Sequence, residues 1–130
     1  PALSSAGETA GVVPFTIDLT SCSPGTNVSV YFEKDQNVST EGRLKNTLTD
    51  GTEAENVDVE LLNTQFTPIN LAETPAVAAD GTIARPDVIP VAVAEQDGSA
   101  SLPFYARYYA TDAATAGKVA TYVNFTVVYP

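Results

Sequence analysis

The sequence contains no histidine, methionine or tryptophan, and Cys22 is the only cysteine among its 130 residues. Without histidine the chain cannot use His-based acid–base catalysis or the commonest zinc ligand sets, which excludes most hydrolase templates. Basic residues are also scarce, because six face sixteen acidic residues and leave a formal net charge of −10. Such a chain repels nucleic-acid phosphates and anionic lipid, so we expect no nucleic acid among its partners.

Long apolar runs are absent as well. No segment approaches the roughly eighteen consecutive apolar residues of a transmembrane helix, and no basic start followed by an apolar stretch indicates a signal peptide. The length fits a single domain, residues 1–130, with a core of its own. Because the chain opens at Pro1 and soon reads as a strand, we expect natural sequence upstream of it. The cysteine leaves two alternatives open, a buried thiol or half of a disulfide with a partner outside the chain.

Helical periodicity is nearly absent, whereas short alternating or β-branched segments recur between clusters of Gly, Asn, Asp, Ser and Pro. The expected strands are residues 12–19, 28–33, 57–62, 66–71, 88–94, 102–109 and 118–129. The polar stretch 34–41 is expected to be a loop. Short strands at this spacing favour an all-β fold, a β-sandwich of immunoglobulin type.

Two of these segments have a clear apolar face. In the first, alternate residues are expected to face the core or a groove beside it: Val13, Phe15, Ile17 and Leu19. In the last, the alternation places these residues on one side: Val119, Thr121, Val123, Phe125, Val127 and Tyr129. On its own, such a pattern indicates the final half-buried strand of a sandwich.

The C-terminal segment combines this alternation with two further features. Tyr129 is the penultimate residue, and Gly117 is fourteenth from the end of the 130 residues. Upstream, residues 103–108 read Pro-Phe-Tyr-Ala-Arg-Tyr, and the first strand leads directly to Cys22. Together these segments resemble the type 1-like pilins of the chaperone–usher family. The resemblance covers both ends of the chain well and residues 35–96 only loosely.

The resemblance implies an incomplete immunoglobulin-like sandwich of Greek-key topology that lacks its last strand. It implies a structural subunit of an adhesive pilus, exported through the periplasm to the cell surface. Its partners would be neighbouring subunits that donate a strand, a periplasmic chaperone and an outer-membrane usher. The residues that would contact the chaperone or donor strand are Gly117, Val119, Val123, Phe125, Val127 and Tyr129.

The resemblance also assigns a role to two single residues. Cys22 would be half of a disulfide whose partner lies upstream of Pro1. Gly117 would allow a close approach of the partner's backbone, because a side chain there would obstruct it. An alternative within the same family is the pilin domain or the receptor-binding domain of an adhesin.

Rival functional patterns are weak. Residues 35–41 alternate polar side chains like a calcium loop, but Thr40 stands where that loop requires glycine. The acidic pairs Glu53 with Glu55 and Asp58 with Glu60 are spaced two apart on polar faces and are interpreted as surface charge rather than as a glycosidase dyad. We therefore expect no enzyme activity, no small-molecule substrate, no metal and no cofactor.

Overall fold

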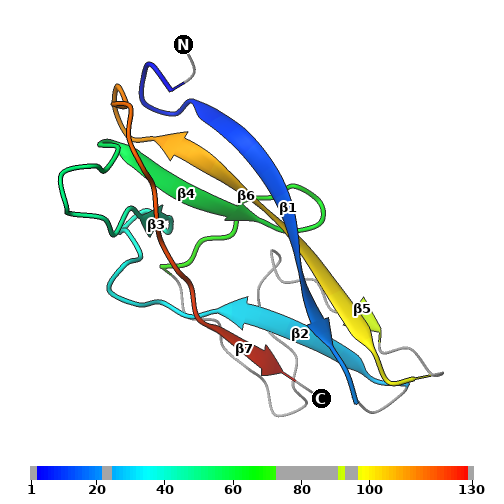
Figure 1. Ribbon diagram of the computed structural model, residues 1–130. Helices are drawn as coiled ribbons and strands as arrows, with labels where there is room; N and C mark the ends of the chain where they lie inside the picture. The colour runs from blue at the N-terminus through cyan, green and yellow to red at the C-terminus, as the bar shows by residue number, and fades with distance from the viewer. Residues whose placement is uncertain (1–2, 22–24, 73–90, 93–96, 129–130) are drawn as a thin grey trace.

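A computed structural model describes residues 3–21, 25–72, 91–92 and 97–128, and the fold is that of these residues (Figure 1). They form seven strands and no helix: β1 (Thr9–Leu19), β2 (Asn27–Phe32), β3 (Leu44–Lys45), β4 (Val57–Leu62), β5 (Val91–Ala92), β6 (Ala100–Ala110) and β7 (Phe125–Val128). No helix in this described part could cross a membrane. The all-β prediction is confirmed.

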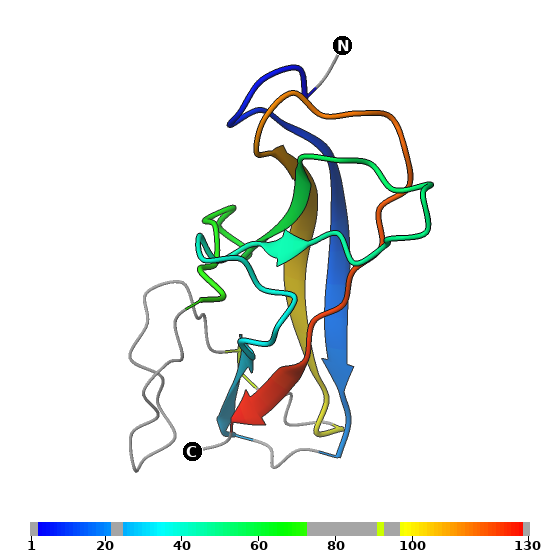
Figure 2. The same cartoon turned by 90° about the vertical axis from the view of Figure 1, so that its left-hand side faces the viewer.

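The strands form two sheets with antiparallel pairing. One sheet has the order β1-β6-β4-β3 and the other the order β5-β2-β7. In Figures 1 and 2 the long β1, β6 and β4 make one layer, and β2 and β7 lie against its lower half. The segment 111–124 leaves the end of β6 and crosses from the first sheet to the second (Figure 1). This is an immunoglobulin-like β-sandwich.

The core lies between the two sheets. Alternate residues of β2, Val28, Val30 and Phe32, are at most 4% exposed, as the period-two pattern requires for a strand facing a core. The ring of Phe104 in β6 lies 5.0 Å from that of Phe32 and 5.5 Å from that of Phe15 in β1. Burial of each large apolar side chain contributes about 1.5–3 kcal/mol, so this aromatic cluster is a main source of stability.

The predicted strand at residues 66–71 is wrong. Only an isolated bridge between Leu62 and Pro68 forms there. The Asn63 Oδ1 atom accepts hydrogen bonds from the N–H groups of Gln65 and Thr67, which folds the backbone into a local turn. Phe66 has a φ of 63°, a left-handed conformation that no strand contains. The apolar pattern predicted a strand, and the side-chain turn prevails.

Other strand predictions agree with the structure to different extents. The strand at 57–62 is found with the predicted bounds, and β1, β2 and β6 begin or end within a few residues of the prediction. The prediction for 88–94 falls largely outside the described residues, with only Val91–Ala92 observed as β5. The short strand β3 was not predicted. Of the predicted strand 118–129, residues 118–128 are described, and among these only Phe125–Val128 belongs to a strand.

Candidate functional site

The C-terminal segment forms an edge of the sandwich. Strand β7 pairs with β2, and no other described strand lies beside it. Strand β1 is likewise the edge of its own sheet, since it pairs with β6 alone among the described strands. An unpaired edge presents a row of backbone N–H and C=O groups that can hydrogen-bond to another strand.

Backbone hydrogen bonding alternates along this edge with a period of two. The groups that bond within the chain belong to even-numbered residues: Lys118 and Ala120 bond to residues 46–54, Tyr122 to Asn37, and Asn124 to Glu33. The backbone groups of Val119, Thr121 and Val123 have no hydrogen bond to any described residue. Successive residues of an extended chain point their N–H and C=O groups to opposite edges, so the odd-numbered set faces outward.

Strand β7 continues the same alternation. The N–H of Glu33 donates to the carbonyl of Asn124 at 2.8 Å, which fixes the phase of the ladder with β2. Hydrogen-bonded and non-hydrogen-bonded pairs alternate in antiparallel sheets. The pair of Thr126 with Tyr31 is therefore hydrogen-bonded, and Phe125 and Val127 direct their backbone groups to the open edge. Residues 119–127 thus offer one continuous set of donors and acceptors.

Apolar side chains on the inner face of this edge are left partly uncovered. Val123 and Val127 pack against the core cluster. Phe125 pairs with Phe32 on the same face, yet Phe125 is 46% exposed and Phe32 only 4%. At the opposite edge Val13 is 58% exposed. Exposed large apolar side chains along two strand edges indicate a surface that another element covers.

Two hollows lie beside the C-terminal segment. One of about 580 Å³ is lined by eleven residues that include Leu3, Tyr108, Gly117 and Val119. The other, of about 190 Å³, is lined by residues from both edges, among them Val13, Tyr108, Val119 and Thr121. The smaller hollow joins β1 (Gly11 and Val13) to Val119 and Thr121, and the larger one continues from Val119 along residues 113–117. The two open edges therefore flank one groove at the smaller hollow.

The sequence-predicted residues come together to different degrees. Val13, Gly117 and Val119 line the hollows. Phe15, Ile17 and Leu19 pack beside the core, together with Val123 and Val127. Cys22 and Tyr129 lie outside the described residues, so the disulfide and the tyrosine contact remain predictions.

Tyr108 lines both hollows and was not among the predicted site residues. It is 40% exposed although it lies in the interior strand of its sheet. The available signal was its alternation with Phe104 and Ala106 in β6, which places these side chains on the inner face.

Gly117 is in close contact with the chain's own backbone. A Cβ atom there would lie 2.5 Å from the nitrogen of Ala54 and 2.6 Å from the carbonyl carbon of Glu53. Real Cβ atoms do not approach backbone so closely, so only glycine fits without movement. The resemblance attributed the glycine to the approach of a partner, which stays a prediction; the structure shows an approach of residues 53–54 of the same chain.

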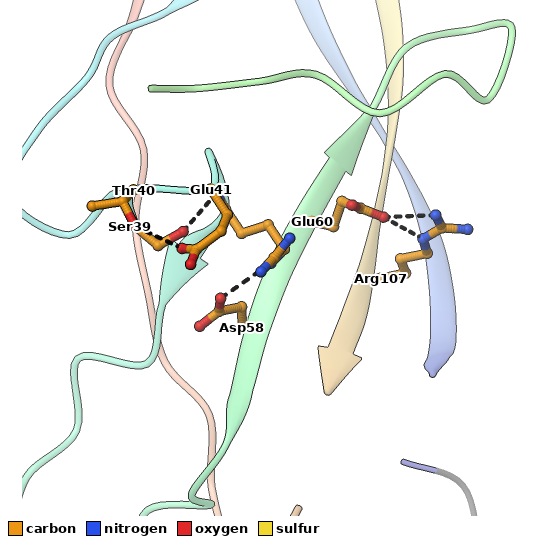
Figure 3. A network of polar contacts seen from close by, with 7 residues as sticks. Ser39, Thr40, Glu41, Asp58, Glu60 and Arg107 are labelled. Atoms are coloured by element: carbon orange, nitrogen blue, oxygen red, sulfur yellow. Dashed lines mark hydrogen bonds and ion pairs between the residues drawn. The ribbon is translucent and has the colours of Figure 1, made fainter. Parts of the chain in front are cut away.

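The acidic pair Asp58 and Glu60 is not surface charge, and that interpretation is corrected. Each residue is 8% exposed on the outer face of β4. The Arg107 Nη2 atom lies 2.6 Å from Glu60 Oε1, and the Arg43 Nε atom 3.2 Å from Asp58 Oδ2 (Figure 3). The Arg43 guanidinium also lies 3.9 Å from the centre of the Tyr109 ring. Both carboxylates are thus occupied by structural ion pairs.

We expect a pH effect from this cluster. Desolvation by burial raises the pKa of the Asp58 carboxyl, and the Glu41 charge adds to the rise, while Arg43 and Lys45 oppose it. As the pH falls through the raised pKa toward the usual value of about 4, the folded chain binds a proton before the unfolded chain does. This group therefore destabilises the fold above its raised pKa, and the penalty disappears on acidification.

Urea titrations of the native chain and Asp58→Asn at several pH values measure the effect. The free energy of unfolding of the native chain relative to Asp58→Asn should increase as the pH falls from about 7 to about 4. A difference that stays constant or decreases over that range would show that burial does not raise this pKa.

Metal ligands do not gather in the described part of the chain, where no group of three or more His, Cys, Asp or Glu side chains could hold an ion. The candidate site is the groove with its open strand edge, which can bind an extended polypeptide.

Comparisons with known proteins are consistent with this geometry. The family model for FimA, described as type-1 fimbrial protein A, matches residues 1–130. The chain is 43% identical over 130 residues to the major fimbrial subunit SMF-1 of Stenotrophomonas maltophilia strain K279a, covering 98% of the chain and 71% of the relative. It is 37% identical over 134 residues to the F17 fimbrial protein of Escherichia coli, covering 98% and 68%.

Solved structures have the same fold. The type I fimbria protein BPSL1626 of Burkholderia pseudomallei is 25% identical with a TM-score of 0.56, over 97% of this chain and 70% of that one. A subunit from the structure of a chaperone–usher pilus is 16% identical with a TM-score of 0.59, over 95% and 72% of the two chains.

Proposed function

The chain belongs to the FimA family of type-1 fimbrial proteins, and we propose that it joins its neighbours through the open edge at residues 119–127. It is a structural subunit of an extracellular fimbria and assembles with other subunits. A strand from a neighbouring subunit would add to the edge and cover the groove between β7 and β1.

One observation carries this proposal, namely that the odd-numbered residues of the edge have backbone groups without partners in the described chain. The same residues place apolar side chains beside the core, where Phe125 stays 46% exposed. Each hydrogen bond to an added strand contributes roughly 0.5–1.5 kcal/mol, and each large apolar side chain inserted roughly 1.5–3 kcal/mol. Several of each explain a tight junction, since strand addition uses both.

The interface residues follow from this geometry. On the C-terminal side they would be Gly117, Val119, Val123, Phe125, Val127 and Tyr129. Val13 would contact the added strand from the opposite edge, with Phe15, Ile17 and Leu19 forming the adjoining core. A periplasmic chaperone would cover the groove before assembly and an outer-membrane usher would oversee the exchange of strands. Residues 1–130 would act as one domain and would catalyse no reaction.

Addition of a strand should stabilise the free chain. The probe is a synthetic peptide of about twelve residues that alternates valine and threonine, with lysine pairs at both ends for solubility. At a peptide concentration of about 100 times its Kd, binding to the folded chain alone contributes about 2.7 kcal/mol. For a domain of this size the Tm should rise by roughly 10 °C, which calorimetry or fluorescence measures.

The control is a peptide of the same length and charge in which one central valine is replaced by proline. It keeps the charge and most of the apolar surface but interrupts the ladder. It should give a much smaller shift. Equal shifts in Tm with both peptides would mean that charge or nonspecific binding causes the effect. This result would contradict strand addition at the proposed edge.

A further inference from the structure

The part of the open edge at residues 118–122 is extended without belonging to a strand. It lies in the crossing from the sheet that contains β6 to the sheet that contains β7 (Figures 1 and 2). A segment between two sheets cannot use the full ladder of either, and an unsupported extended segment of this length has high conformational freedom. Something other than a ladder must therefore hold this part of the edge.

Asn46, immediately after β3, bonds to this segment with its side chain. Its Nδ2 atom donates to the carbonyl of Lys118 at 2.9 Å and to that of Ala54 at 3.0 Å. Its Oδ1 atom accepts from the N–H of Ala120 at 3.1 Å and from that of Leu48 at 3.2 Å. An asparagine amide has two donors and two acceptor lone pairs, so all four are used.

Four further hydrogen bonds, two from Thr47 and two from Asn37, act on the same segment. The backbone N–H and the Oγ1 hydroxyl of Thr47 both donate to the carbonyl of Ala120 at 2.8 Å. Asn37 is 4% exposed, and its Nδ2 atom donates to the carbonyl of Tyr122 and to Thr121 Oγ1. All but one of these bonds go to even-numbered residues, so they leave the backbone groups of the odd-numbered residues free for a partner.

Gly117 brings the segment into range of these groups. The N–H of Lys118 donates to the carbonyl of Thr52, and its carbonyl accepts from the N–H of Ala54, both at 2.9 Å. This short parallel contact with Glu53 exists only because residue 117 has no Cβ, which would lie 2.5 Å from the Ala54 nitrogen. Removal of this contact would also remove the Lys118 carbonyl from Asn46.

We propose that Asn46 and Gly117 are positioning residues that hold residues 118–122 extended before any partner arrives, so that the edge is preformed in the free chain. In this role Gly117 acts on its own chain, and the Asn46 amide replaces the missing ladder. The benefit to the proposed function, on which this inference rests, is that a partner strand need not order the segment as it binds. Disorder of the segment would lower the affinity and the rate of addition.

Hydrogen exchange of the free chain tests the positioning role without a partner. A failure of this role and a failure of the partner interaction therefore give different results. In Asn46→Ala the amide of Ala120 should exchange roughly tenfold faster relative to the amides of β4 and β6, because local opening replaces global opening. A residue with a general structural role would instead lower protection throughout the sandwich. Gly117→Ala should give the same local pattern, extended to Lys118 and Ala54.

Asn124→Ala is the matched control, since Asn124 lies in the same C-terminal segment but its side chain makes a single exposed bond to Asp35 Oδ2 at 3.1 Å. It should leave the exchange at Ala120 unchanged. Should Asn46→Ala fail to fold, Asn46→Ser decides the question by the same comparison. Unaltered protection at Ala120, or an equal loss in β4 and β6, would overturn the proposal.

Discussion

Replacement of Val123 by proline is expected to abolish the addition of a partner strand while leaving the free chain folded. The N–H of Val123 has no partner in the described chain, so its loss costs the isolated fold no hydrogen bond. In an added strand the same N–H would be a ladder donor, and proline would remove it and place its ring in the path of the partner. Proline is therefore tolerated only while the edge stays open.

The measurement compares fibre formation with the thermal unfolding of the free chain. Val123→Thr is the matched control, because it keeps the N–H and nearly the shape of the side chain. The control should assemble, whereas Val123→Pro should stay as soluble, folded subunits. Ala120→Pro should unfold the segment instead, because the N–H of Ala120 is bonded to Asn46 Oδ1. Normal fibres from Val123→Pro would show that assembly uses another surface.

Phe104→Ala is expected to destabilise the chain by about 3–5 kcal/mol, a large share of the stability of a typical domain. The Phe104 side chain is 8% exposed and joins the two sheets through its contacts with Phe15 and Phe32. Its removal leaves a cavity in the centre of the core, since aromatic side chains of both edge-bearing sheets meet there. A chain whose groove is open has little stability to lose, so we expect the Phe104→Ala variant to be largely unfolded.

Urea titration followed by circular dichroism measures this effect. Phe66→Ala is the control, because Phe66 is 44% exposed and packs against Tyr105 and Arg107 on the outer face. Its loss should cost less than about 1 kcal/mol, in line with a surface substitution. If both variants lost equal stability, the aromatic cluster would not be the centre of the core.

The sequence predicted best those segments whose side chains alone determine the structure. Residues 57–62 alternate toward a core and have clear turn residues on both sides, and the strand has those bounds. Residues 66–71 have a similar apolar content, but the Asn63 side chain bonds to the following backbone and turns the chain. Such a turn depends on a single side-chain rotamer, which a pattern of apolar residues does not reveal.

The sequence predicted the alternation of residues along the candidate site but not the side chains that hold the segment in place. The apolar period of residues 119–127 indicated which side chains face the core, and Val123 and Val127 do pack against it. The side-chain bonds of Asn46 link residues 72 and 74 positions apart in sequence. Only the fold brings them together, so no local pattern could identify Asn46 as part of the site. The same holds for the contact of Gly117 with residues 53–54.

Assembly through this edge requires that the odd-numbered backbone groups of residues 119–127 are open in the free subunit and paired in the fibre. Residue-resolved hydrogen exchange of both forms tests it most directly. We expect the amides of Val119, Thr121, Val123, Phe125 and Val127 to exchange freely in the free chain and to become protected on assembly. The amides of Ala120 and Thr126 should be protected in both forms. Odd-numbered amides that were already protected in the free chain, or still exposed in the fibre, would show that assembly does not use this edge.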